Sequence, residues 1–198
     1  MISVYNIKPK FQELLKPILA LMHKQGITAN QITISSILLS FVIGIGFWFA
    51  DINITLFLIL PIGLFLRMAL NALDGMMART YNQQSKKGEV LNEIGDLVSD
   101  LFVFFPLLKF EKEIFYLIVV FICLSIINEF AGILGKVVSN VRRYEGPMGK
   151  SDRTLILGVY GILSYFSINF NEYSIYIFSV ITSLLIISTF IRIKKSLK

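Results

Sequence analysis

Long apolar segments alternate with short polar connections along almost the whole chain. A segment of about 20 apolar residues is long enough to cross the hydrocarbon core of a bilayer as a helix. Six segments are near this length, and the fifth is the shortest. The pattern therefore predicts an all-α polytopic membrane protein with six transmembrane helices, at Gln31–Ala50, Ile54–Thr80, Val90–Lys109, Ile114–Val138, Thr154–Ile168 and Ser174–Ile193.

Residues 1–30 predict a separate cytoplasmic segment, an interfacial amphipathic helix and a turn, ahead of a single membrane domain over residues 31–198. Apolar residues recur there at three- and four-residue spacing, while lysines fall between them, as in a helix that lies on a membrane surface. Pro17 predicts a kink or a break. The alternative is a basic tail without this helix. The apolar residues of the stripe are Phe11, Leu14, Leu15, Ile18 and Met22.

The end of this segment predicts how the first span begins. Thr28 or Asn30 offers an N-cap for the helix that starts near Gln31. No apolar core followed by a small-residue cleavage site precedes it, so we expect no cleaved signal peptide.

Composition agrees with a membrane domain and excludes some kinds of site. The chain has 198 residues, of which 55% are hydrophobic and 16% charged, and its mean hydropathy is +0.71. Soluble domains carry about 25% charged residues. With only Cys123 and His23, the chain cannot build a disulfide framework or a metal site of cysteines and histidines.

The basic residues predict the orientation. Sixteen of the 19 lysines and arginines fall in the N-terminal segment, the loops near residues 80 and 145, and the C-terminus. Cytoplasmic connections carry such an excess. We therefore expect a protein of the cytoplasmic membrane of a prokaryote, with both termini and the active site cytoplasmic. The net charge of +6 is explained by this topology and by attraction to anionic lipid, so no nucleic-acid partner is expected.

Two polar stripes interrupt the second and third apolar segments. Asn71, Asp74, Gly75 and Ala78 share one helix face, and Glu89, Glu93, Asp96 and Asp100 share another, with Asn92 beside Glu93. Carboxylates within a membrane segment cost a few kcal/mol each and mark functional sites by default. A short turn between two antiparallel helices would bring the two stripes together.

Facing carboxylates need a positive partner. Oxygen ligands without histidine or cysteine favour a hard cation such as Mg²⁺ or Mn²⁺, which bridges carboxylates to substrate phosphates. The alternative is a buried ion-pair or hydrogen-bond network that uses Arg67, Arg79 or Lys87.

A second polar group follows the fourth apolar segment. Arg142, Arg143, Lys150 and Arg153 flank a turn rich in glycine and proline, and they would suit a second, anionic substrate such as a phosphorylated one. The positive-inside rule alone is an equal explanation. Glu129, inside the fourth segment, should face the bundle, either against polar partners or as an extension of a cavity.

The run from Asn71 to Asp96 resembles the signature of the CDP-alcohol phosphotransferases. That signature reads Asp-x-x-Asp-Gly-x-x-Ala-Arg, eight residues, Gly, three residues, Asp, three residues, Asp. The matching positions in this chain are Asp74, Gly75, Ala78, Arg79, Gly88 and Asp96. Family members transfer a phospho-group from a CDP-linked donor, commonly CDP-diacylglycerol, to an alcohol with release of CMP, and they are usually homodimers.

The resemblance implies a role for each matching position. One or two Mg²⁺ or Mn²⁺ ions would be held by Asn71, Asp74, Asn92 and Asp96. CDP would be contacted by Asp74, Gly75, Ala78, Arg79 and Gly88, and Asp96 would be the catalytic base. Asn71 and Asn92 replace two signature aspartates, which weakens the expected metal affinity, and Glu93 is the obvious substitute ligand.

The sequence therefore predicts a metal-dependent membrane phosphatidyltransferase of phospholipid biosynthesis. Its expected partners are a CDP-diacylglycerol-like lipid donor and a small polar or phosphorylated alcohol acceptor. The two asparagines motivate an alternative, a catalytically silent relative that binds CDP-lipid or partners an active enzyme. A small ion-relaying transporter is a third reading, but it requires polar residues through the whole membrane depth.

Overall fold

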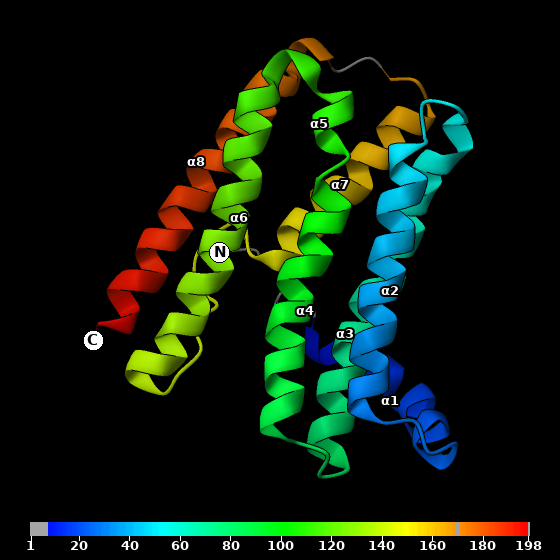
Figure 1. Ribbon diagram of the computed structural model, residues 1–198, viewed down its shortest axis with the longest axis vertical. Coiled ribbons are helices and arrows are strands. Elements are labelled where there is room, and N and C mark those ends of the chain that lie inside the picture. The colour runs from blue at the N-terminus through cyan, green and yellow to red at the C-terminus, as the bar shows by residue number, and fades with distance from the viewer. Residues whose placement is uncertain (1–7, 169–170, 198) are drawn as a thin grey trace. The chain divides into compact units, whose positions relative to one another are not determined.

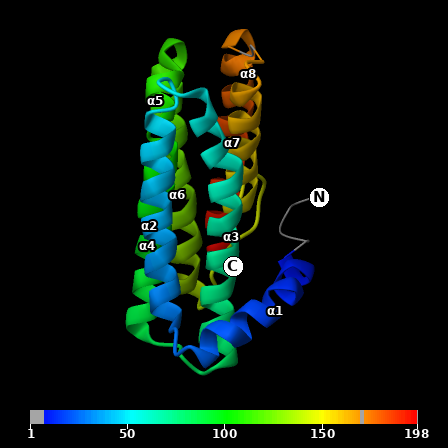
Figure 2. The same cartoon turned by 90° about the vertical axis from the view of Figure 1, so that its right-hand side faces the viewer.

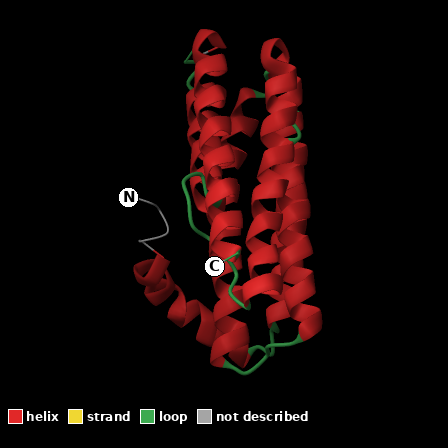
Figure 3. Cartoon of the chain, turned by 90° about the vertical axis from the view of Figure 1, so that its left-hand side faces the viewer, coloured by secondary structure: helices red, strands yellow, loops and turns green. Residues whose placement is uncertain are grey.

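Every regular element in the described part of the chain is a helix (Figures 1 and 3). The computed structural model describes residues 8–168 and 171–197. The expected all-α class is confirmed for this part, whereas Met1 to Ile7 of the N-terminal segment and Lys198 lie outside it. In chain order the elements are α1 (Lys8–Lys24), α2 (Ala29–Trp48), the short 3-10 helix η2 (Ile54–Leu58), α3 (Ile59–Thr80), α4 (Lys86–Phe104), α5 (Leu107–Phe110), η3 (Lys112–Ile114), α6 (Phe115–Ser139), α7 (Lys150–Tyr165) and α8 (Asn171–Ser196).

Four stretches of helix in the described residues are long and apolar enough to cross a membrane: Ala29–Trp48, Ile54–Thr80, Lys112–Ser139 and Glu172–Ser196. The other two expected spans differ from them for physical reasons. α4 carries the charged stripe and ends at Phe104, just before Pro106. α7 has 16 residues, about 24 Å of helix at 1.5 Å per residue, which is less than a core of about 30 Å. The chain is thus a helical membrane protein.

The chain divides into two compact units, and the first ends at Val103. In this unit α2 and α3 form an antiparallel hairpin, and α4 runs along them (Figures 1 and 2). Glycine allows the close approach of α4 to α2. A Cβ atom on Gly95 would lie 2.6 Å from Ile37 Cδ1, and one on Gly44 would overlap the carbonyl oxygen of Phe102.

α1 packs across the end of α3 that leads into the α3–α4 turn (Figure 2). It is one continuous helix through Pro17, so of the predicted kink or break the break is absent. Leu15 and Leu19 are buried in a core cluster with residues of α2 and α3. Leu14 and Ile18, expected on the same face as Leu15, are exposed instead. α1 therefore has a buried apolar stripe and a second, exposed one.

The start of α2 is fixed by a capping box. The backbone N–H of Gln31 donates to Thr28 Oγ1 at 3.3 Å, and the N–H of Thr28 donates to Gln31 Oε1 at 2.8 Å. These bonds satisfy N–H groups that have no partner within the helix. Of the two predicted caps, Thr28 is the one used, and Asn30 lies inside the helix.

The second unit begins at Phe104 and contains α5 to α8, with α6 and α8 as its main packed pair. The loop after α6 folds back along that helix, because the N–H of Arg143 donates to the carbonyl oxygen of Gly132 at 3.1 Å. Gly146 then takes a left-handed conformation, φ +103°, against Ser188 of α8. The fold thus draws the basic loop against α6 and α8.

Candidate functional site

Two of the predicted ligands on α3 face hydroxyl groups of α2. Ser36 Oγ donates to Asn71 Oδ1 at 2.6 Å, and Thr33 Oγ1 lies 3.0 Å from Asp74 Oδ2. Asp74 is 5% exposed. The hydroxyl donors orient both oxygen-bearing side chains within the first unit.

The small residues of the α3 stripe lie beside the arginine that closes the signature. A Cβ atom on Gly75 would be 3.2 Å from Arg79 Nη1, so the guanidinium group lies over Gly75 one helical turn away. Arg79 itself is exposed in the last turn of α3, and Ala78 is half-buried against the core cluster. A positive group therefore lies directly against the glycine of the signature.

An ion pair fixes the register between α3 and α4. Arg67 Nη2 donates to Asp100 Oδ1 at 2.6 Å, and both side chains are almost fully buried. Antiparallel helices rise equally in opposite directions. Asn71 lies four residues after Arg67, and Asp96 lies four residues before Asp100, so these two residues are at the same height along the helix pair. Asp74 and Glu93 are each seven residues from the ion pair and are level for the same reason. Part of the predicted ion-pair network is therefore real, and it aligns the two stripes.

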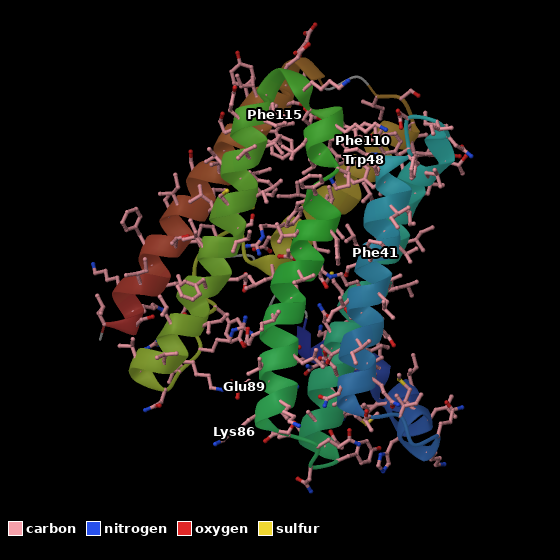
Figure 4. The ribbon with its side chains drawn as sticks, viewed as in Figure 1. Phe41, Trp48, Lys86, Glu89, Phe110 and Phe115 are labelled. Carbon is pink, nitrogen blue, oxygen red and sulfur yellow. The ribbon has the colours of Figure 1, made fainter. Side chains whose placement is uncertain are left out.

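The predicted residues of α4 line its first turns. Asn92, Glu93 and Asp96 are half-buried. The N–H of Gly88 donates to Ser85 Oγ at 3.0 Å, and Asn30 Oδ1 would lie 2.7 Å from a Cβ at Gly88. Figure 4 shows Lys86 and Glu89 at this end of α4, whereas Trp48 lies at the far end of α2. The signature residues of the first unit thus gather toward the α3–α4 turn.

The oxygen atoms of these side chains are the kind of ligand that a hard divalent cation prefers, but they carry few negative charges. Within residues 8–168 and 171–197, no three histidine, cysteine, aspartate or glutamate side chains form a group that could hold a metal ion. The aligned set instead mixes the amide oxygens of Asn71 and Asn92 with carboxylates. Amide and carboxylate oxygens both bind Mg²⁺ and Mn²⁺. The residues fit such an ion with fewer negative charges than four aspartates would bring.

In the second unit the basic residues divide into two groups. Arg153 Nη2 and Arg142 Nη2 lie 3.0 and 3.4 Å from the carboxylate oxygens of Glu129. Arg143 instead donates to Ser139 Oγ at 3.1 Å and lies 3.8 Å from Glu145. Lys150 is the first residue of α7. The structure therefore brings together two of the four predicted basic residues.

The carboxylate of Glu145, on the loop, belongs to a separate ion pair with Lys195 Nζ at 3.1 Å. Partial burial pushes the pKa of Glu145 up. Hydrogen bonds from backbone N–H groups and from Lys195, together with the charge of that lysine, outweigh the burial and hold the pKa of Glu145 below its ordinary value. Glu145 therefore stays ionised at neutral pH, and its negative charge is paired with the positive charge of Lys195.

The sequence pattern did not predict several polar residues that take part in these contacts in the two units. Arg192 of α8 lies 3.5 Å from Glu129 Oε1, although its position in the chain indicated only a basic C-terminus. Ser36 and Thr33 sit within an apolar helix. A spacing signal was available for them, because the small or polar residues of α2 recur at i, i+4, i+7 and i+11: Ala29, Thr33, Ser36 and Ser40.

Comparison with known sequences gives two findings. Residues 26–191 match the sequence profile of the CDP-alcohol phosphatidyltransferases. The chain is also 46% identical over 160 residues to the inner membrane protein YnbA of Escherichia coli strain K12, covering 81% of this chain and 79% of that protein.

Solved structures share the fold. The phosphatidylinositol phosphate synthase of Mycobacterium tuberculosis, in complex with manganese and citrate, aligns with a TM-score of 0.71 and 18% identity, over 92% of this chain and 88% of that one. Its structure with CDP-DAG bound aligns with a TM-score of 0.72 and 18% identity, over 93% and 94%. With the profile match across most of its length, the chain belongs to the CDP-alcohol phosphatidyltransferase family.

Proposed function

We propose that this protein transfers a phosphatidyl group from CDP-diacylglycerol to a polar alcohol, with release of CMP, in phospholipid biosynthesis. The proposal rests on family membership and on one observation, the register that sets the stripe of α3 against that of α4 through Arg67 and Asp100. The synthase of similar fold was crystallised with CDP-DAG, which supports a CDP-lipid donor.

The donor would be held by the signature residues of the first unit. The Arg79 guanidinium, which lies over Gly75, would bind the diphosphate of the CDP group beside the small residues Gly75 and Ala78. Gly88 and the buried carboxylate of Asp74 complete the proposed CDP contacts.

The acceptor hydroxyl attacks the phosphorus that carries the diacylglycerol group. A new oxygen–phosphorus bond forms, the bond to the CMP oxygen breaks, and the hydroxyl proton moves to a carboxylate oxygen of Asp96. Asp96 is half-buried on the stripe of α4, and a positioned carboxylate of this kind can act as a general base. Asn71, Asp74, Asn92 and Asp96, with Glu93 as a further ligand, would hold one or two Mg²⁺ or Mn²⁺ ions. Such an ion, when bound, neutralises charge on the diphosphate.

The acceptor would be bound by the basic residues of the second unit, Arg142, Arg143, Lys150 and Arg153. The close pair Arg142 and Arg153 favours an acceptor that carries a phosphate, because planar guanidinium groups bind phosphate oxygens in pairs.

The proposed membrane arrangement extends the four apolar helices to six. α4 and α7 would cross within the bundle, since their charged residues could then face its interior. The exposed apolar residues of α1, among them Leu14 and Leu21, would lie in the cytoplasmic interface. Both termini and the active site would be cytoplasmic, and the active form would be a homodimer.

The second candidate is a catalytically silent relative that binds CDP-lipid or partners an active enzyme. Asn71 and Asn92 favour it, because two neutral amides hold a divalent cation less tightly than two carboxylates.

The test is CMP release from CDP-diacylglycerol by the purified protein, with Mn²⁺ or Mg²⁺ and a panel of acceptors (glycerol, inositol, serine and the phosphates of glycerol and inositol). An active transferase releases CMP with at least one acceptor, and a silent relative releases none. Asp96→Asn should lower turnover at least about 100-fold, as expected for loss of a general base. The matched control Asp51→Asn, in the exposed turn after α2, should keep wild-type turnover. Substantial turnover by Asp96→Asn would show that another group is the base.

A further inference from the structure

One hydrogen bond joins the α3–α4 turn to the first turn of α2. The side-chain oxygen Oε1 of Gln83, in the turn, accepts the backbone N–H of Ala29 at 2.7 Å, and the two residues are 54 positions apart. Ala29 is the first residue of α2. The first four N–H groups of an α-helix have no partner within the helix. Gln83 therefore supplies, from another segment, a bond that α2 cannot supply itself.

The backbone of Gln83 is fixed to the end of α3. Its N–H donates to the carbonyl oxygen of Ala78 at 3.0 Å, and Asn82, the residue before it, has a left-handed φ of +53°. A bond that reaches back five residues across a left-handed residue is the Schellman ending of a helix. Gln83 thus holds Ala78 of the signature through its main chain and α2 through its side chain.

The start of α4 lies against the same turn of α2. A Cβ atom on Gly88 would be only 2.7 Å from Asn30 Oδ1, and the N–H of Gly88 donates to Ser85 Oγ at 3.0 Å. Asn30 follows Ala29 directly in α2. Both halves of the signature therefore meet the first turn of α2, one through Gln83 and the other through Asn30.

We propose that Gln83 is a positioning residue of the CDP-donor site, which sets the end of α3 relative to the start of α4. The inference rests on the proposed function, because it assumes that residues at these two helix ends bind CDP. Gln83 does not itself have to contact the donor. Its bond to Ala29 keeps Arg79, in the last turn of α3, at a fixed place relative to Gly88, so a ligand that contacts both residues meets a site already organised.

A bond that only stabilises α2 would have a different consequence. Loss of a helix cap lowers the free energy of unfolding, but the molecules that remain folded would bind CDP as before. Loss of a positioning bond lowers the affinity of the folded molecules, because the ligand must then order the turn itself. The affinity for CDP, measured where every variant is folded, separates the two roles.

The experiment is an isothermal titration of the full chain with CDP, in detergent micelles with Mn²⁺, at a temperature at which every variant is folded. Gln83→Met keeps the length of the side chain and removes its oxygen. We expect the affinity for CDP to fall about fivefold, as for the loss of one hydrogen bond. Gln84→Met, which changes the exposed neighbour, should bind CDP like the wild type.

Ala29→Pro removes the other partner of the same bond. Proline is favoured at the first residue of a helix, so this substitution takes away the N–H and leaves α2 able to form. The affinity of this variant for CDP should also fall about fivefold. Ala29→Pro/Gln83→Met should lose no more than either single variant, because all three remove one and the same bond.

Wild-type affinity in Gln83→Met overturns the proposal, as does a wild type that does not bind CDP. Losses that multiply in the double variant also overturn it, because Gln83 and Ala29 would then act separately. If Gln83→Met does not fold, Ala29→Pro decides alone, and wild-type affinity in that variant is the contrary result.

The result is separable from the test of catalysis. Binding of CDP needs no turnover, so a protein that releases no CMP can still show the expected losses of affinity. Conversely, a transferase that releases CMP while Gln83→Met binds CDP like the wild type would overturn this inference and leave the proposed transfer intact.

Discussion

At the scale of single residues, hydroxyl groups of α2 orient the oxygen-bearing side chains of α3. Ser36 and Thr33 bond to Asn71 and Asp74, and each of these bonds needs only an oxygen acceptor. An aspartate at position 71 would accept the same bond. The hydroxyl group of Ser36 therefore holds the amide oxygen of Asn71 where it could hold the oxygen of an aspartate.

This geometry predicts the effect of restoring the missing carboxylates. The double variant Asn71→Asp/Asn92→Asp should bind Mn²⁺ about tenfold more tightly, a change of about 1.4 kcal/mol, because each substitution adds a negative charge at an aligned ligand position. Isothermal titration of the purified protein with Mn²⁺ measures the affinity without requiring turnover.

The control for this prediction is Asn82→Asp. It adds a carboxylate in the exposed turn between α3 and α4, outside both stripes. Its affinity for Mn²⁺ should equal that of the wild type. Equal affinities of the wild type and the double variant would mean that positions 71 and 92 do not contact the ion.

At the scale of elements, buried polar contacts decide how the helices meet. Arg67 and Asp100 join α3 to α4 in a place where both charges are out of water. Removing one partner of such a pair leaves the other charge uncompensated, which is more damaging than removing both.

Asp100→Asn should therefore lower the free energy of unfolding by about 3 to 5 kcal/mol. Arg67→Met/Asp100→Leu should recover much of that loss, because neither charge then remains buried. Unfolding in mixed detergent micelles measures both. Lys16→Gln breaks the exposed pair with Glu13 and should change stability little. A double variant less stable than Asp100→Asn would contradict this account of the pair.

The loop between α6 and α7 gives a second prediction at this scale. Gly26 and Gly146 both have positive φ, +75° and +103°. A Cβ at Gly26 meets open space, whereas one at Gly146 would lie 2.7 Å from the backbone of Ser188. Gly26→Ala should cost about 1 kcal/mol from its backbone alone. Gly146→Ala should cost clearly more, because the loop must move away from α8.

Thermal unfolding of the two glycine variants side by side is the measurement. Gly146→Ala should also weaken the binding of phosphate, since the same loop carries Arg142 and the carbonyl oxygen of Glu145 that holds Arg192. Equal stabilities for the two variants would mean that the loop does not dock on α8.

The sequence predicted these elements well where local rules govern them. Thr28 carries its own capping signal, and the spacing of the signature residues placed both stripes on helices that the structure contains. Contacts between distant segments were not predictable, because no local pattern links Arg192 to Glu129 or selects Leu15 over Leu14 as the buried residue of α1. Such choices depend on which helix packs against which.

At the scale of the whole molecule, composition and basic-residue bias predicted a polytopic membrane protein, and four apolar helices agree with it. The expected count of six transmembrane helices depends on α4 and α7, whose buried polar residues lower the hydropathy of these helices. Asp100 and Arg153 are buried within these two helices. A window of hydropathy cannot tell a charge that faces other helices from one that faces lipid.

Labelling with a membrane-impermeant maleimide tests the orientation. The background is Cys123→Ser, which removes the single cysteine. In intact cells, cysteine at exposed Ile52, in the turn after α2, should react. Cysteine at exposed Gln84, in the α3–α4 turn, should react only after the membrane is permeabilised. Reaction of both positions in intact cells would exclude the predicted orientation of the first unit.

The pair of Arg67 and Asp100 also bears on biogenesis. The two residues are 33 positions apart, so the ribosome delivers the arginine well before its partner. An arginine at the centre of an inserting helix costs about 2.5 to 3.5 kcal/mol. Until Asp100 emerges from the ribosome, nothing offsets the cost of inserting Arg67 with α3. We therefore expect the translocon to hold α3 at the lateral gate until α4 follows, and to release the two helices into the lipid together as one hairpin.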